Sequence, residues 1–409
     1  MKLIKIFNIF DLNFILCFCG FTIFTTFVDS SIGSIVYRGA TLMLSIICLF
    51  LSGLKFGKNT LLKIFVGIFG IILIKITLDF YLFGVDNIYK ASANNAILFA
   101  YGVTFIPMLS VIGSWKRIHT NTCILIIFTS LFIILGVEYF KTDITVKAGR
   151  AVLNPRQSFL TYGDSGAYLA IISLTILSSL RGFKFRTVLS VLAILGILIG
   201  FYSIGKAASR GPLVGCIAGI IYVAANSTKM IKNISIITLV VACISYIAVL
   251  GYMEEAAPVL YSRVMSTIED NDTSGRDEIF EEALQIIDKS PIIGGNPVIL
   301  EQHGSFTCFH NCYLDVAVGT GVIGGLIYLF IIGSLAINSI RLGRKMNTPW
   351  DLFIMGMLWF FMFRSLSGVA IVTNTTFDIC VALSLIIIYN KKHRFGYEHY
   401  ASNKKLSAD

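Results

Sequence analysis

His310 and Asn311 stand immediately before a long apolar segment, in the stretch CFHNCYLDVAVGTGVIGG. An imidazole titrates near neutral pH and can accept a proton from a hydroxyl group, so His310 is a candidate general base. The carboxamide of Asn311 could orient the ring. A histidine at the start of an apolar helix can equally be an ordinary interfacial residue, so the interpretation depends on the other residues that share its side of the membrane.

Two arginines are candidates for binding an anion near His310. Arg210 lies between two apolar runs in YSIGKAASRGPLVG, and Arg276 opens an amphipathic segment. A planar guanidinium group binds phosphate through paired, charge-assisted hydrogen bonds. The simpler alternatives are that Arg210 reaches lipid headgroups and that Arg276 pairs with a neighbouring acid. The combination favours chemistry on a lipid-linked phosphate compound without identifying the reaction.

The composition indicates that a membrane protein carries these residues. Of the 409 residues, 56% are hydrophobic and 14% are charged, whereas about a quarter of an ordinary soluble domain is charged. Apolar runs of about 17 or more residues, long enough to cross a hydrocarbon core of roughly 30 Å, recur along the chain. The sequence predicts an all-α, polytopic membrane helix bundle, with residues 1–409 forming a single integral membrane domain.

About twelve transmembrane segments are predicted. They lie near residues 12–28, 32–53, 61–83, 95–113, 122–140, 164–180, 187–204, 212–227, 233–252, 311–333, 351–370 and 373–390. Basic residues recur in alternate connections, which places both termini in the cytoplasm. The net charge of +10 therefore reflects membrane orientation, and no nucleic-acid partner is expected.

The opposite face carries one large loop, residues 253–310, with eleven acidic and three basic residues. Within it, TSGRDEIFEEALQIIDKSP predicts a short amphipathic helix, because Ile279, Ala283 and Ile287 recur at helical spacing. Pro291 lies just past its expected end. Such a helix would lie on the membrane surface or cover a cavity.

The cysteines do not predict a disulfide framework or a metal centre. Most of the nine are scattered in apolar segments, where cysteine behaves as a small hydrophobic residue. Cys308, His310 and Cys312 cluster, but three such groups without a second Cys/His pair are a weak zinc signature. No metal ion and no cofactor are expected.

The stretch around His310 resembles a motif of the bacterial O-antigen polymerase and O-antigen ligase superfamily. That motif is His, then Asn, Ser or Gln, nine residues, Gly, two residues and Gly. His310, Asn311, Gly321 and Gly324 match it without gaps. The two glycines are expected to let a neighbouring helix pack closely.

Two further segments support the resemblance. The sequence Ser-Arg-Gly at 209–211 is similar to a Ser-Arg-Gly at the start of a span in this superfamily. The sequence Gly-Arg at 275–276, followed by KSPIIGG, is similar to a Gly-Arg…Pro-x-x-Gly segment of its large periplasmic loop. The resemblance is specific over about 200–335 and only topological elsewhere.

The resemblance implies a metal-independent, GT-C-like membrane glycosyltransferase of the bacterial inner membrane. It would transfer a glycan from undecaprenyl diphosphate to an acceptor hydroxyl on the periplasmic side. By position, His310 would be the base, and Arg210 and Arg276 would hold the diphosphate. The implied partners are the undecaprenyl-diphosphate-linked oligosaccharide, an acceptor glycan, the lipid bilayer, and a chain-length regulator or other polysaccharide assembly proteins.

Other polar residues could support this site. Asn311, Lys206, Arg150, Arg156 and Arg364 are the supporting candidates; Arg364 would face the cavity from the middle of a span. Lys75 and Asp79 are also within a span, and their spacing of four residues is expected to let them pair on one helix face.

The favoured interpretation is an O-antigen polymerase, with an O-antigen ligase as the alternative. The stretch between Arg276 and His310 is short, which favours the polymerase because ligases often have a longer one. The Arg-x10-Gly motif of some polymerases is absent, which argues against it. A flippase for a lipid-linked glycan would also suit twelve spans, but it would be expected to carry more ionisable residues within them.

Overall fold

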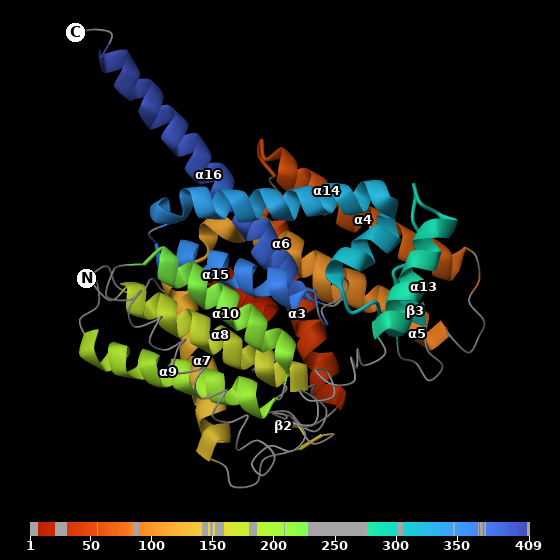
Figure 1. Ribbon diagram of the computed structural model, residues 1–409, viewed down its shortest axis with the longest axis horizontal. Coiled ribbons are helices and arrows are strands. Elements are labelled where there is room, and N and C mark those ends of the chain that lie inside the picture. The colour runs from red at the N-terminus through yellow and green to blue at the C-terminus, as the bar shows by residue number, and fades with distance from the viewer. Residues whose placement is uncertain are drawn as a thin grey trace.

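The computed structural model describes residues 7–20, 31–54, 56–82, 84, 90–140, 146–147, 150–151, 159–179, 186–207, 209–227, 276–300, 306–346, 348–366, 368, 371 and 374–406. These residues form a helix bundle with two small two-stranded sheets (Figure 1). The expectation of an all-α membrane protein is confirmed in its architecture.

The helices follow the apolar runs of the sequence. The first helices are α1 (Ile9–Ile15) with η1 (Leu16–Gly20), α3 (Ser31–Ser52) and α4 (Thr60–Tyr81). Helix α5 (Lys90–Ile97) then continues through η2 (Leu98–Phe105) into α6 (Ile106–Ser114) and η3 (Trp115–Arg117). The other helices before the large loop are α7 (Thr120–Phe140), α8 (Phe159–Ser179), α9 (Arg186–Lys206) and α10 (Arg210–Ala225). Later helices are α13 (Arg276–Lys289), α14 (Cys312–Leu342) with η5 (Gly343–Lys345), α15 (Pro349–Arg364) and α16 (Thr375–Leu406). Strands β1 (Val146–Lys147) and β2 (Arg150–Ala151) form one antiparallel pair, and β3 (Val298–Leu300) and β4 (Phe306–Cys308) form the other.

Every predicted span except 233–252, which lies outside the described residues, overlaps one of these helices. Within the described part of the chain, six helical segments are long and apolar enough to cross a membrane. They are Ile35–Ser52, Thr60–Tyr81, Lys90–Arg117, Thr120–Phe140, Arg186–Lys206 and Cys312–Lys345. The protein is therefore a multi-pass membrane protein, and the number twelve stays a prediction.

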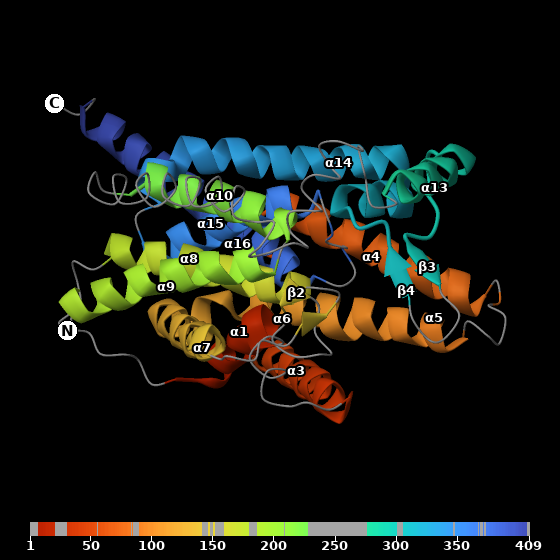
Figure 2. The same cartoon turned by 60° about the horizontal axis from the view of Figure 1, so that its bottom comes forward.

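The amphipathic helix predicted in the large loop is confirmed as α13. Its Ala283 is fully buried against Phe309 and Val318, while Glu281 and Glu282 are exposed. Both views place α13 and the β3–β4 hairpin at one end of the bundle, and α16 extends beyond the opposite end (Figures 1 and 2). The helix thus covers the first part of α14, next to the His310 turn.

The prediction that Gly321 and Gly324 admit a neighbouring helix is wrong. Gly321 has φ 73° and ψ 179°, so it interrupts the helical geometry of α14. The turn after α13 fills this break: the amide of Val322 donates a hydrogen bond of 2.8 Å to the carbonyl of Pro291. A side chain at Gly321 would collide with the backbone there, and Gly324 faces a side chain of its own helix. Gly321 therefore joins α14 to the large loop.

Helix α15 lies at the centre of the bundle and is buried along most of its length. It packs against α10 in an antiparallel direction, because Gly215 contacts Phe360 and Gly219 contacts Gly356. Glycine permits this close approach, since a side chain at Gly219 would lie 2.8 Å from the Gly356 carbonyl. The first residue of α10 and the last residue of α15 consequently lie at the same end of the bundle.

Candidate functional site

His310 lies in the turn between β4 and α14, and its side chain is exposed. Its φ of 52° is in the left-handed region, which no other non-glycine residue adopts in the described part of the chain. Such a conformation costs about 1–3 kcal/mol and persists only where the surrounding structure holds it. Strained backbone of this kind clusters at functional sites, so the geometry supports His310 as a site residue.

The segment after α15 holds the His310 turn in place. The amide of Gly368 donates a hydrogen bond of 2.6 Å to the carbonyl oxygen of His310, and the amide of Cys312 donates one of 3.2 Å to the carbonyl of Ser365. The turn is therefore attached to the end of α15 at His310 itself and at Cys312, two residues later.

Asp315 adds a second connection and was not identified from the sequence. Its side chain is fully buried. Its Oδ1 accepts a hydrogen bond of 3.1 Å from the Phe309 amide, and its Oδ2 accepts one of 3.0 Å from the Ile371 amide. One carboxylate thus joins the residue before His310 to the segment after α15. The available signal was a lone acid in the first turn of an otherwise apolar span.

Asn311 is the N-cap of α14. Its Oδ1 accepts hydrogen bonds from the amides of Tyr313 (3.0 Å) and Leu314 (3.2 Å). An N-cap of this type typically contributes about 1 kcal/mol. Since the oxygen is occupied by capping, the predicted orientation of His310 by Asn311 would have to come from the carboxamide nitrogen, and it stays a prediction.

Arg364 is 1% exposed and forms an ion pair with Asp164 of α8. The Nε–Oδ1 distance is 2.8 Å and the Nη2–Oδ2 distance is 3.4 Å. The expected cavity-facing cation therefore has a carboxylate partner, itself 15% exposed, which the sequence did not reveal because the two residues are 200 positions apart. Arg364 also directly precedes Ser365, so the pair braces the backbone to which the His310 turn is attached.

Arg210 is the first residue of α10 and is half-buried. The next turn of α10 packs on α8, where Gly163 contacts Pro212. Together with the antiparallel contact of α10 and α15, this places Arg210 at the same end of the bundle as the Asp164–Arg364 pair. Figure 2 shows α8, α10 and α15 side by side.

The remaining predicted site residues are only partly described. Arg276 is the first residue of α13, and Arg150 lies in β2 opposite Lys147, but neither side chain is among the described parts. Arg156 lies outside the described residues. Lys206 is exposed at the end of α9, where its Nζ lies 5.7 Å from the centre of the Tyr202 ring. The anion-binding roles of these residues stay predictions.

The burial and charge around Cys308 affect whether the cluster of Cys308, His310 and Cys312 could bind a metal ion. Burial raises the pKa of the Cys308 thiol well above its usual range, and the Asp315 carboxylate raises it further. Metal ligation requires the thiolate, so a protonated Cys308 is a poor ligand. Among the described residues no group of three His, Cys, Asp or Glu side chains has a metal-binding arrangement.

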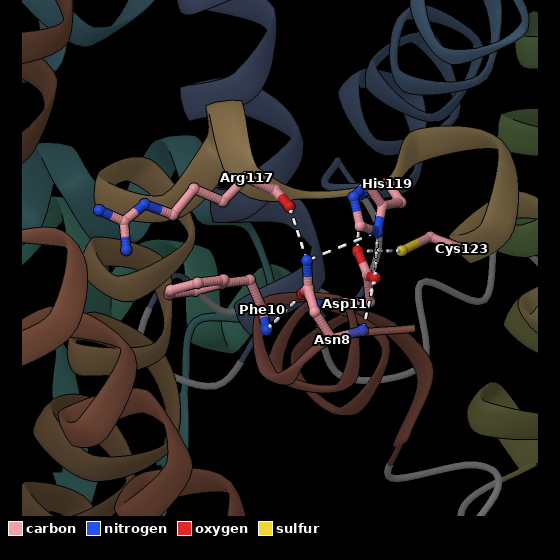
Figure 3. Close-up of polar contacts among 6 residues, drawn as sticks. All are labelled: Asn8, Phe10, Asp11, Arg117, His119 and Cys123. Carbon is pink, nitrogen blue, oxygen red and sulfur yellow. Dashed lines mark hydrogen bonds and ion pairs between the residues drawn. The ribbon is translucent and has the colours of Figure 1, made fainter. Parts of the chain in front are cut away.

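A second polar cluster involves α1 and the start of α7 (Figure 3). Asp11 is fully buried and accepts hydrogen bonds from the His119 amide (2.6 Å), from its Nδ1 (2.9 Å) and from the Cys123 thiol (3.7 Å). Asp11 therefore bridges the imidazole and the thiol, and the cluster joins α1 to α7.

Comparison with known protein families matches residues 195–329 to a family described as O-antigen ligase. No curated protein matches the chain. The matched segment contains Arg210, Arg276 and His310, together with the glycines of the motif. The match confirms that this multi-pass membrane protein resembles the O-antigen polymerase and O-antigen ligase superfamily over the segment that carries these residues.

Proposed function

We propose that this protein is a polymerase of O-antigen or a related surface polysaccharide. It would transfer a glycan from undecaprenyl diphosphate to a sugar hydroxyl of another lipid-linked unit. The observation that carries the proposal is the strained His310 turn, which is braced by Asp315 and Gly368 and lies within the family-matched segment. The proposed location is the bacterial inner membrane, with a GT-C-like bundle, both termini in the cytoplasm and the site facing the periplasm.

In the proposed reaction, His310 accepts the proton of the acceptor hydroxyl as its oxygen attacks the anomeric carbon of the donor glycan. The bond between that carbon and the diphosphate oxygen breaks, and the electron pair remains on the diphosphate. Arg210 and Arg276 offset the charge that develops there, because fixed cations act strongly where water is scarce. With these two cations and a diphosphate leaving group, the scheme requires no metal ion.

The second candidate is an O-antigen ligase, which would transfer the finished glycan to lipid A–core. The matching family is described as O-antigen ligase, which supports this candidate. The short stretch between Arg276 and His310 favours the polymerase. Both candidates share the donor and the proposed site, so only the acceptor separates them.

The test is reconstitution of the purified protein with lipid-linked repeat units, with and without lipid A–core. Longer lipid-linked glycans support the polymerase, and transfer only to lipid A–core supports the ligase. His310→Ala, Arg210→Ala and Arg276→Ala should each reduce transfer strongly. His393→Ala and Arg186→Ala are matched controls, because both residues are exposed and lie outside the proposed site. Full activity of all three site variants would contradict the proposal, and movement of intact lipid-linked glycan without transfer would indicate a flippase.

A further inference from the structure

A groove of about 500 Å³ lies between α4 and α14. Its apolar wall includes Ile68 and Ile71 of α4, Ile323 of α14, and Ile292 from the turn after α13. Ile71 and Ile323 are half-exposed, and Ile292 is 69% exposed. Because α4 and α14 are both long and apolar enough to cross a membrane, we expect Ile71 and Ile323 to face hydrocarbon when the protein is embedded.

Glycine keeps the groove open. The two helices contact each other through Phe65 and Tyr328, whose ring centres are 6.4 Å apart, and through Ile72 and Gly319. A side chain added at Gly67, which lines the groove, would meet nothing within 4 Å. The space is therefore available to another molecule.

One cation, Lys75, lines this groove, whose other lining residues are apolar except for Thr320. Its Nζ is buried and has no hydrogen-bond partner among the residues that the structure describes, Asp79 included. The expected pairing of Lys75 with Asp79 is thus not made as a hydrogen bond. Asp79 acts on this ammonium group only at longer range, without a hydrogen bond. A buried ammonium group that makes no hydrogen bond is costly, so the groove favours an occupant that brings a negative charge.

The geometry also orients the occupant. Phe65 faces Tyr328 and Ile72 faces Gly319, so α4 and α14 are antiparallel. Lys75, one turn further along α4, therefore lies toward the His310 end of α14. From Lys75 back to Ile64 the groove follows α4 over eleven residue-to-residue steps, or roughly 16 Å at 1.5 Å per step. That length is about half of a hydrocarbon core of roughly 30 Å.

We propose that this groove binds the polyprenyl diphosphate of the donor or product, with Lys75 paired to the diphosphate and the hydrocarbon chain lying along α4 toward Ile64. The inference rests on the proposed function, because it assigns a place to the lipid carrier of that reaction. The charge at one end and the apolar wall along the rest match an anionic headgroup on a long chain. Exposed Ile292 and Ile293 extend the apolar wall from the turn that fills the break in α14.

The test is lipid binding to the purified full-length protein, measured by native mass spectrometry with undecaprenyl diphosphate, uncharged undecaprenol or phosphatidylglycerol. Lys75→Met should weaken binding of undecaprenyl diphosphate by at least about tenfold, because it removes one member of a buried charge pair. It should leave undecaprenol unchanged. Lys63→Met, on the same helix but exposed outside the groove, should alter neither.

A second pair of variants tests whether the apolar wall of the groove binds the hydrocarbon chain. Gly67→Leu should fill the groove and weaken binding of both polyprenyl lipids. Gly70→Leu should not, because Gly70 has equally open surroundings but does not line the groove. Wild-type binding by Lys75→Met, or phosphatidylglycerol competing as well as undecaprenyl diphosphate, would overturn the inference.

The two proposals can fail separately. If lipid binding depends on Lys75 but the protein transfers no glycan, the groove proposal stands and the proposed function is rejected. If glycan transfer depends on His310 but lipid binding is independent of Lys75 and Gly67, the proposed function stands and the groove proposal is rejected.

Discussion

Gly368 donates a backbone hydrogen bond of 2.6 Å to the carbonyl oxygen of His310. This contact holds the candidate base in its left-handed conformation and ties it to the end of α15. Because the neighbouring backbone imposes this conformation, substitutions at position 310 can separate the effect of backbone strain on stability from the effect of the imidazole on activity.

His310→Gly and His310→Ala should differ in stability but not in activity. Glycine adopts a positive φ at no steric cost, whereas alanine pays about 1 kcal/mol or more. We expect the glycine variant to unfold at a higher temperature than the alanine variant, while both lose glycan transfer. Thermal unfolding in detergent measures the difference. A more stable alanine variant would contradict the left-handed conformation.

Asp315→Asn should impair the site through its backbone contacts. The asparagine keeps one acceptor oxygen but presents an N–H₂ group to the second amide, so either Phe309 or Ile371 loses its partner. Leaving a buried donor unsatisfied costs about 1–3 kcal/mol. We expect a lower unfolding temperature and a fall in kcat with little change in KM for the donor. Asp288→Asn, at an exposed position of α13, is the matched control. A large rise in KM alone would instead indicate that Asp315 contacts the donor.

Loss of either member of the Asp164–Arg364 pair should destabilise the protein. Arg364 is 1% exposed and Asp164 is 15% exposed, and removing one member of a largely buried ion pair costs about 3–5 kcal/mol. We expect Asp164→Asn and Arg364→Met each to lower stability, and the double variant to lower it by less than their sum. The Asp351–Lys391 pair, whose lysine is 21% exposed, should show weaker coupling in the same double-mutant cycle. Additive effects at Asp164 and Arg364 would contradict the ion pair.

Gly321→Ala should loosen the connection between α14 and the large loop. The added methyl group would collide with the carbonyl groups of Pro291 and Ile292, and the φ of 73° is itself unfavourable for alanine. We expect lower stability and faster proteolysis at residues 290–296. Gly333→Ala in the same helix should be neutral or stabilising by about 0.5–1 kcal/mol, since nothing lies within 4 Å of its added methyl group. Equal effects of the two substitutions would exclude a special role of Gly321.

The sequence by itself determined that the protein is an all-α, multi-pass membrane protein, and it supplied the residues of the candidate site as a prediction. Contiguous apolar runs specify membrane helices because their length must match the hydrocarbon core, and the 3.6-residue period specified α13. The order and spacing of Arg210, Arg276, His310 and Gly321 were sufficient for the family resemblance, since these are local features of the chain.

Only the tertiary structure decided how the site is held. The partner of Arg364 lies 200 residues away, and Asp315 reaches a segment 56 residues downstream. A hydrophobic pattern states that a helix is buried but not which helix it meets, so it reveals neither contact. The prediction at Gly321 was wrong for the same reason. The spacing of the glycines fits helix packing, but it does not reveal that the turn after α13 fills the break in α14.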